Sequence, residues 1–346
     1  MLFRSTLAFD EPKIQSTESN ELSDVFQESV FEVIKQGEEK EELRFVDAVA
    51  QGLAQAMEHH DDLVIMGQDI AEYGGVFKIT EGLFEKYGPG RVRNTPICES
   101  AILSAAMGLS INGFKSVVEM QFADFVSSGF NPIVNYLAKS HYRWGQNADV
   151  VVRMPCGAGV GAGPFHSQTN EAWFTHTPGL KVVYPAFPED AKGLLAASIA
   201  DPNPVLFFEH KALYRSVRGM VPKNYYHLPL GQAAVLSQGT EVALITYGAG
   251  VHWALELPED LKNHCRILDL RSLVPLDKDT IITAVKATGK VLILQEDSMF
   301  GGIASDLSAI ISEECFEFLD APIRRVASLE TPIPFANALE QQYLAK

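Results

Sequence analysis

The stretch VVVRMPCGAGVGAGPFHSQTNEAWFTHTPGLKVVYP, residues 150–185, decides the fold. It starts with an apolar strand at 150–154, continues through a glycine-rich loop and a short helix near Glu171, and ends in a second strand at 182–184. Strands that are joined by a helical crossover lie parallel in one sheet, and such a sheet is covered on both faces. The segment therefore predicts an α/β domain.

The same alternation of helix and strand extends in both directions. Upstream, we predict elements at 45–57 (helix), 63–67 (strand), 100–111 (helix), 115–120 (strand) and 123–141 (one long helix). Downstream, we predict a helix at 188–200 and strands at 205–209, 242–246, 266–270, 291–295 and 323–327. The pattern is interrupted between residues 212 and 239, which contain prolines and glycines.

These patterns predict two doubly wound α/β domains in one chain. The predicted parts are an acidic leader at 1–44, a first domain at 45–215, a linker at 216–239 and a second domain at 240–346. Residues 1–44 hold eleven acidic and five basic side chains, a net charge of −6. We interpret them as a largely flexible leader with one short helix.

Composition and charge exclude several classes of function. Of the 346 residues, 47% are hydrophobic and 21% charged, as in a typical globular protein. The 44 acidic and 28 basic side chains leave a net charge of −16, so we expect neither nucleic-acid nor membrane binding. The four cysteines are scattered, which predicts a reducing, cytoplasmic setting and no zinc held by cysteines.

Glu99 is the first candidate for chemistry. A carboxylate at the start of a helix has an ordinary explanation, because the helix dipole stabilises it. The neighbours Ile97, Ala101, Ile102 and Leu103 are apolar, however, and we expect them to surround the carboxyl group. Removal from water raises the pKa of a carboxyl group and lets it donate a proton. Glu99 is therefore also a candidate acid/base residue.

The glycine-rich run at 157–163 precedes the second candidate, His166. Glycines permit close approach of the backbone to a ligand. The run is not a dinucleotide-binding motif, because Pro164 stands where the helix would begin. His166 and His176 do not have the spacing of a metal site, and either could be an ordinary hydrogen-bonded residue. His166 is the better functional candidate, because it follows the loop directly.

A third group of candidates lies where a strand passes into a helix. Gln121, Phe122, Asp124 and Phe125 fall at this transition. Ligands of open α/β sheets bind at the carboxyl ends of strands, which favours ligand contact for these side chains. The two phenylalanines fit a place in the core equally well.

Six segments stand in a characteristic order. They are MGQDIAEYGGVFKIT (66–80), RNTPICESAI (93–102), VEMQFADF (118–125), FHSQTNEAWFTHTPGLKVVYP (165–185), NPVLFFEHKALYR (203–215) and LETPIPFANALEQ (329–341). Together they strongly resemble the beta subunit of the thiamin-diphosphate-dependent 2-oxoacid dehydrogenases, over about residues 43 to 343. The resemblance implies a pyrimidine-binding domain that is followed by a transketolase-like C-terminal domain.

The resemblance also implies roles for individual residues. Glu99 would hydrogen-bond a ring nitrogen of the aminopyrimidine of thiamin diphosphate and help to activate the thiazolium carbon that attacks the 2-oxo group. Phe125 would stack on the aminopyrimidine, Ile97 would pack near it, and Gln121 would line the substrate pocket. His166 would face the reacting centre and assist transfer of the acyl group to a lipoyl arm.

Relatives of the branched-chain type also hold a structural monovalent cation, K⁺, chiefly on main-chain oxygens. The positions that match in this chain are Ala148, Val150, Val151, Ser198, Asp201 and Asn203.

Several partners follow from the resemblance. In the family, an alpha subunit supplies the GDG…N motif that holds Mg²⁺ and the diphosphate; this chain has no GDG and should contain half an active site. Other expected partners are a second beta subunit in a heterotetramer, a lipoyl acyltransferase core and a small-molecule 2-oxoacid. Because the leader is longer than usual, we also consider that residues 1–44 are the junction of a fused alpha–beta chain.

Alternatives remain open at the level of function. Gln121 with Asp124 resembles the branched-chain (2-oxoisovalerate) type more than the pyruvate type. A transketolase-like or sugar-phosphate synthase fragment would need more basic residues for a substrate phosphate. A non-catalytic scaffold subunit is a different class, and the presence of both Glu99 and His166 argues against it.

Overall fold

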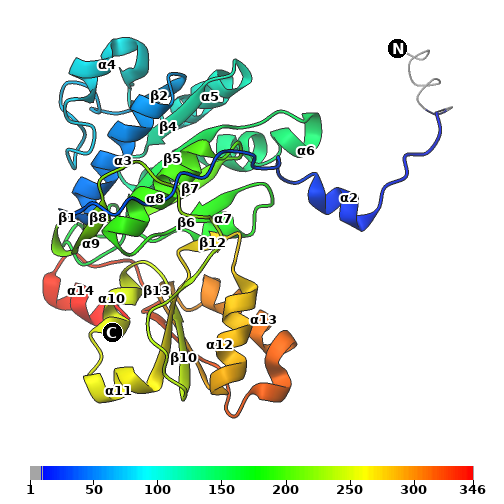
Figure 1. Ribbon diagram of the computed structural model, residues 1–346, viewed down its shortest axis with the longest axis vertical. Helices are drawn as coiled ribbons and strands as arrows, with labels where there is room; N and C mark the ends of the chain where they lie inside the picture. The colour runs from blue at the N-terminus through cyan, green and yellow to red at the C-terminus, as the bar shows by residue number, and fades with distance from the viewer. Residues whose placement is uncertain (1–8, 10, 346) are drawn as a thin grey trace.

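The chain forms two α/β units, one above the other in the view of Figure 1. The computed structural model describes residues 9 and 11–345, so the parts of the predicted leader and second domain at 1–8, 10 and 346 lie outside it. Both units consist of largely parallel sheets with helices, which confirms the predicted fold class. Within the described chain, no helix combines the length and the apolar character that crossing a membrane requires.

The first unit contains a seven-stranded sheet in the order β12-β6-β7-β5-β4-β2-β3. Its strands are β2 (Leu63–Gly67), β3 (Val92–Asn94), β4 (Lys115–Glu119), β5 (Val150–Cys156), β6 (Lys181–Val183), β7 (Val205–His210) and β12 (Ser272–Val274). All pairs are parallel except that of β12 with β6. Because β12 comes from the second half of the chain, the two units share this sheet.

Helices cover both faces of the first sheet. They are α3 (Phe45–His59), α4 (Leu83–Arg91), α5 (Glu99–Ile111), α7 (Ala172–Thr175), α8 (Pro188–Ala200) and α9 (Leu213–Ser216). Alternate residues of β7 point to opposite sides: Phe207 packs with α3 and α8, whereas Phe208 joins the cluster that contains α5. Burial on both faces explains why the strands read as continuous apolar runs.

The predicted long helix at 123–141 is wrong. The segment forms a 3₁₀ helix η1 (Ala123–Gly129), a π-helix η2 (Pro132–Leu137) and the short helix α6 (Ser140–Trp144). Gly129 lies so close to α5 that a Cβ there would overlap the Leu103 side chain. Pro132 then cannot donate a backbone hydrogen bond to the preceding turn, which interrupts a regular α-helix.

The second unit contains a five-stranded sheet in the order β14-β13-β10-β11-β9. Its strands are β9 (Ala234–Val235), β10 (Val242–Thr246), β11 (Cys265–Asp269), β13 (Val291–Ser298) and β14 (Arg324–Ser328). Its helices are α10 (Ala249–Leu255), α11 (Glu259–His264), α12 (Lys278–Thr288), α13 (Ile303–Cys315), the 3₁₀ turn η3 (Phe316–Phe318) and α14 (Asn337–Tyr343). The four strands predicted here are all present.

The leader contains one short helix, as predicted, but the leader and the linker each also contain a strand that was not predicted. The end of the leader forms the strand β1 (Lys40–Arg44). It pairs antiparallel with β8 (Arg218–Pro222), which lies in the predicted linker. Before β1, the leader contains α2 (Glu18–Ser23), and its Gln27 N–H donates to the Asn203 side chain at 2.8 Å. β1 was missed because its sequence, KEELR, is mostly charged and its side chains are at most half-buried.

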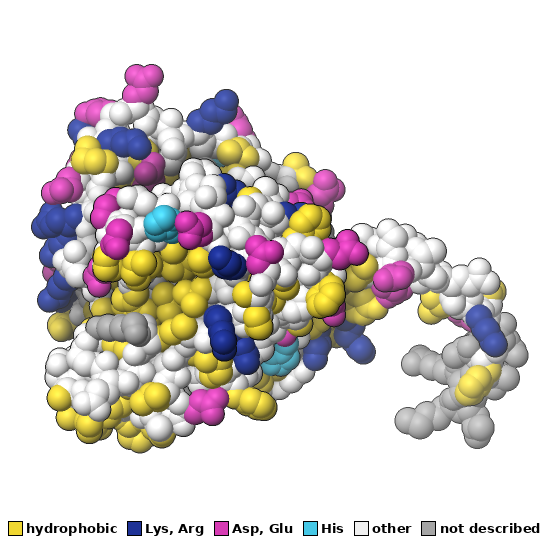
Figure 2. All heavy atoms as spheres, turned by 90° about the horizontal axis from the view of Figure 1, so that it is seen from below, with side chains coloured by type: hydrophobic (Ala, Val, Ile, Leu, Met, Phe, Trp, Pro, Cys, Tyr) yellow, Lys and Arg dark blue, Asp and Glu magenta, His cyan; other side chains and the backbone are white. Residues whose placement is uncertain are grey.

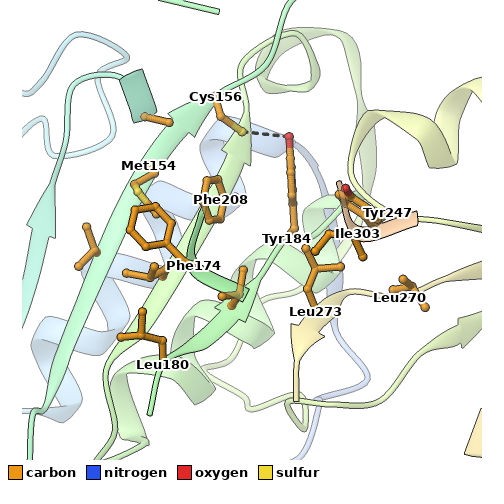
Figure 3. Packing of buried hydrophobic residues seen from close by; sticks show 14 of the residues in the cluster. Met154, Cys156, Phe174, Leu180, Tyr184, Phe208, Tyr247, Leu270, Leu273 and Ile303 are labelled. Atoms are coloured by element: carbon orange, nitrogen blue, oxygen red, sulfur yellow. Dashed lines mark hydrogen bonds between the residues drawn. The ribbon is translucent and has the colours of Figure 1, made fainter. Parts of the chain in front are cut away.

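One hydrophobic cluster runs through both units. Figure 3 shows Tyr184 of the first unit beside Tyr247, Leu270 and Leu273 of the second, all in the same cluster. The Cys156 thiol donates a hydrogen bond to the Tyr184 hydroxyl at 2.9 Å. The continuous core holds the two sheets in a fixed relation.

A buried ion-pair network stabilises the first sheet. Arg153 is fully buried on β5 and donates to Glu119 on β4 at 2.6 Å and to both carboxylate oxygens of Glu209 on β7 at 2.7 and 2.8 Å. The Tyr214 hydroxyl donates to Glu209 at 2.6 Å. Burial raises the pKa of Glu119, so this carboxylate depends on the guanidinium for its charge.

Replacing Arg153 by methionine should therefore lower the free energy of unfolding by about 3–5 kcal/mol, because two carboxylates lose their buried counter-ion. The matched control is Lys86→Met, which removes an exposed pair with Glu58 and should cost at most about 1 kcal/mol. Urea denaturation of the three proteins measures both losses. An equal, small loss in the two variants would contradict the role of the network.

Candidate functional site

The predicted site residues lie at the carboxyl edge of the first sheet. Gln68 and Asp69 follow β2, Gln121 follows β4, and Glu99 is the first residue of α5. This edge is where parallel α/β sheets bind ligands.

Glu99 is buried, with 7% of its surface exposed. Its Oε1 accepts a hydrogen bond from the Gln68 side chain at 3.0 Å, while its Oε2 has no hydrogen-bond partner among the described residues. Glu99 therefore has one oxygen that is held by the protein and one that is left for a ligand.

The predicted apolar surroundings of Glu99 are only partly correct. Ile102 and Leu103 are buried, whereas Ala101 is exposed and Ile97 is 84% exposed. On a helix, Ala101 points away from the face that Ile102 and Leu103 bury against the core. Ile97 lies in the extended segment before α5 and faces outward.

Three aromatic rings form the other side of the site. The His166 ring lies edge-on to Phe122, with centroids 4.8 Å apart, and to Phe125 at 5.4 Å. Phe122 also contacts Phe125 at 5.6 Å and Phe77 at 5.8 Å. The structure thus brings His166 together with the strand-to-helix residues.

A series of contacts connects Glu99 and His166. Gln68 holds Glu99, and the adjacent Asp69 accepts a hydrogen bond from Gln121 at 3.3 Å. Gln121 precedes Phe122, which touches His166. Sequence reasoning missed Gln68 and Asp69, although their position directly after the apolar strand LVIMG was a signal for them.

Asp124 is held by the His166 segment. Its Oδ1 accepts from the Gln168 side chain at 2.9 Å, whereas its Oδ2 is buried without a hydrogen-bond partner in the described part of the chain. A buried polar atom without a partner is unusual in a folded protein and is consistent with a place for a ligand or water.

A cavity of about 610 Å³ adjoins Phe122. Lys211 and Arg215 line it, together with the aromatic rings of Phe77 and Tyr214. The Lys211 ammonium donates to the Gly157 carbonyl at 2.9 Å and lies 5.7 Å from the Phe122 ring centroid. Burial lowers the pKa of Lys211. The cavity combines aromatic walls with two basic side chains, a combination that suits a small anion with an apolar part.

The positions predicted for a cation lie at the opposite, amino edge of the sheet. The six residues are buried and occupy the start of β5 and the end of α8, namely Ala148, Val150, Val151, Ser198, Asp201 and Asn203. Val151 on β5 pairs with Val205, which is two residues beyond Asn203. The start of β5 and the segment after α8 therefore lie at the same edge of the sheet.

The polar side chains among them, Ser198, Asp201 and Asn203, already have protein partners. Asp201 accepts from Lys181 at 2.5 Å and Ser29 at 2.6 Å through Oδ2, and from the Asn203 amide groups through Oδ1. Across the described residues, His, Cys, Asp and Glu form no group of three or more that could hold a metal ion. The positions therefore fit only a cation that binds main-chain oxygens.

Comparison with known proteins agrees with this geometry. Residues 41–217 match the transketolase pyrimidine-binding domain, and residues 231–346 match the transketolase C-terminal domain. The chain is 44% identical to the 2-oxoisovalerate dehydrogenase subunit beta of Bacillus subtilis, over 87% of this chain and 94% of that protein. It is 39% identical to the pyruvate dehydrogenase E1 component subunit beta of the same organism, over 86% and 93%.

A solved structure described as a split-gene transketolase in an inactive beta4 tetramer has a similar fold. Its TM-score is 0.68 at 21% identity, and the match covers 87% of this chain and 93% of the other. The domain matches and the extent of identity to the two Bacillus proteins together establish membership: the chain belongs to the family of 2-oxoacid dehydrogenase beta subunits.

Proposed function

We propose that this chain is the beta subunit of a cytoplasmic dehydrogenase that decarboxylates a branched-chain 2-oxoacid and transfers the acyl group to lipoyl. The observation that carries the proposal is the series of contacts, through Gln68, Asp69 and Gln121, that links the free oxygen of buried Glu99 to the His166–Phe122–Phe125 cluster. The name of the relative at 44% identity supports the branched-chain substrate, and the pyruvate alternative rests on a relative at 39%.

The residues fit thiamin diphosphate, which when bound would supply the carbon nucleophile that decarboxylates the 2-oxoacid. Glu99 would hold a ring nitrogen of the aminopyrimidine through Oε2 and exchange a proton with it. Gln68 fixes the carboxylate from the other side, so the proton is exchanged at one defined oxygen. Phe125 would stack on the aminopyrimidine, and Ile97 would pack beside it.

His166 would act after carbon dioxide has left. Its ring packs edge-on against both Phe122 and Phe125, which limits its orientation. In this position it can donate or accept a proton while the acyl group passes to the sulfur of a lipoyl arm. Gln121 would line the pocket of the 2-oxoacid.

The site is open on one side, which supports a two-subunit active centre. Ile97 and Phe165 flank the site residues and are 84% and 68% exposed. We propose that an alpha subunit covers them and brings Mg²⁺ and the diphosphate-binding groups, in a tetramer with a second beta subunit. K⁺ on the main-chain oxygens near Asp201 is part of the same proposal.

The surface seen from below offers an area for a further partner. There, apolar side chains gather in one area, and charged groups are scattered around it (Figure 2). An exposed apolar area of this kind is typical of a surface that contacts protein. The proposed partner at this surface is a lipoyl acyltransferase core, which would receive the acyl group from the enzyme.

Calorimetry tests the proposal of a shared site. The purified chain alone should bind thiamin diphosphate poorly even with Mg²⁺, because the diphosphate-binding groups lie on another polypeptide. Addition of the alpha subunit should restore tight binding. Micromolar binding to the chain alone would contradict the half-site, and an alpha–beta mixture without binding would contradict the proposed function.

A further inference from the structure

The glycine-rich loop that leads to His166 has an unusual backbone. Gly157, Gly159, Gly161 and Gly163 all have positive φ angles, of 87°, 89°, 69° and 71°. Residues with a side chain rarely adopt these angles. Alternation of such glycines turns several backbone N–H groups toward the inside of the loop, where they form a site for negative charge.

Two buried carboxylates of the second unit fill this site. Glu340 on α14 is fully buried and accepts from the N–H of Gly159 at 2.8 Å and from the N–H of Gly161 at 3.2 and 3.1 Å. Glu296 on β13 accepts from the N–H of Ala158 at 2.7 Å. Hydrogen bonds to a charged acceptor are about twice as strong as neutral ones.

Three groups around Glu296 stabilise its charge. Burial by itself would raise the pKa of Glu296, but His210, the Ala158 N–H and Lys211 together hold it below its usual value. His210 lies 2.5 Å from the other carboxylate oxygen of Glu296. Within the described chain, the hydrogen bonds of the Glu340 carboxylate are those with the loop, and the carboxylate also attracts the Lys211 ammonium. The two acids therefore differ: Glu296 belongs to a wider network, and Glu340 serves the loop.

Contacts at both ends also fix the loop in place. The Gly157 N–H donates to the Gln168 carbonyl at 3.1 Å, and Gly163 packs on Phe335, so that a Cβ at residue 163 would overlap the ring. His166 lies between these fixed points, and its N–H donates to the Gly163 carbonyl at 3.4 Å. A shift of the loop would therefore move the His166 ring against Phe122 and Phe125.

We propose that Glu340 is a positioning residue for His166: its carboxylate anchors the glycine-rich loop, so that the C-terminal domain sets the geometry of acyl transfer. Glu340 lies in a domain that contributes none of the other site residues, and it acts only through the loop. The activity assays that test this inference rest on the proposed function.

The first test observes the anchor itself. In Glu340→Gln, one amide oxygen can still accept a hydrogen bond but the negative charge is lost, and in Glu340→Ala both are lost. Hydrogen exchange at residues 158–163 should become faster in both variants, more so in the alanine variant, while exchange in β4 and β5 stays unchanged. The control is Glu330→Gln, an exposed acid before α14, which should leave the loop unchanged. Unchanged loop exchange in both Glu340 variants would overturn the proposal.

The second test asks whether the effect passes through His166. In the assembled enzyme, Glu340→Ala should slow lipoyl acylation by about 10- to 100-fold, since misplacement of a reacting group by about 1 Å costs this much. Decarboxylation that is coupled to an artificial acceptor should change by less than about threefold. In a His166→Ala background, Glu340→Ala should add no further loss of acylation.

Each contrary result is informative. Equal losses in the two assays, or a loss that adds fully to that of His166→Ala, would show a general structural role and overturn the positioning role. If the alanine variant does not assemble, Glu340→Gln decides, with the same selectivity and a smaller loss. A parent enzyme that does not acylate lipoyl would contradict the proposed function, while the hydrogen-exchange result would still report on the anchor.

Discussion

Replacing Glu99 by glutamine should reduce turnover by about 100- to 10,000-fold without unfolding the chain, because loss of an acid/base group typically costs this much. The amide can still hydrogen-bond Gln68 and a cofactor nitrogen, but it cannot exchange a proton. Binding of thiamin diphosphate to the assembled enzyme should therefore change far less than the rate of carbon dioxide release. Steady-state kinetics and calorimetry on the same preparation measure the two effects.

Glu85 provides a matched control, because it is exposed and also lies in the first turn of a helix. Glu85→Gln removes the same favourable contact with a helix dipole and should leave turnover unchanged. If the two variants behave alike, or if Glu99→Gln keeps activity within threefold of the parent, Glu99 has only the ordinary helix-terminal role.

Replacing His166 by alanine should slow acyl transfer to lipoyl by about 100-fold or more, the usual contribution of a general acid/base group. The first decarboxylation should be less affected, because His166 is proposed to act after carbon dioxide leaves. An artificial-acceptor assay and a lipoyl-domain acylation assay on one variant separate the two steps.

The control for His166 is His176→Ala, in the same segment of chain. His176 is exposed, and its ring lies 3.2 Å from the Ala172 carbonyl of the adjacent helix α7. This variant should behave as the parent in both assays. Equal losses in the two assays for His166→Ala would refute a role that is specific to acyl transfer.

The sequence predicted the buried elements well, because their patterns have few alternatives. The strands β5 and β7 each begin with an apolar run, VVV and VLFF, and α8 was predicted with the observed bounds, Pro188–Ala200. Gln121 and Phe125 could be singled out because carboxyl ends of parallel strands collect functional side chains. Glu99 was singled out because it begins a helix among apolar residues, and His166 because it follows the glycine-rich loop.

Features that depend on distant contacts could not be predicted in this way. The charged strand β1 exists because β8, more than 170 residues away, pairs with it. The close approach of Gly129 to Leu103 of α5 is likewise a contact between segments that are apart in the sequence. Glu340 lies in a polar C-terminal segment, and only the structure shows its contact with the glycine-rich loop. In each case the partner that decides the local structure is remote in the sequence.

The central claim is tested most directly by reconstitution of decarboxylation. The chain is mixed with its alpha partner, thiamin diphosphate and Mg²⁺, and kcat/KM is measured for 3-methyl-2-oxobutanoate and for pyruvate. We predict cofactor-dependent release of carbon dioxide, with a preference for the branched-chain acid of about tenfold or more, as expected when a pocket distinguishes extra methyl groups. A preference for pyruvate would contradict the branched-chain assignment, and no cofactor-dependent release from either acid would contradict the proposed function as a whole.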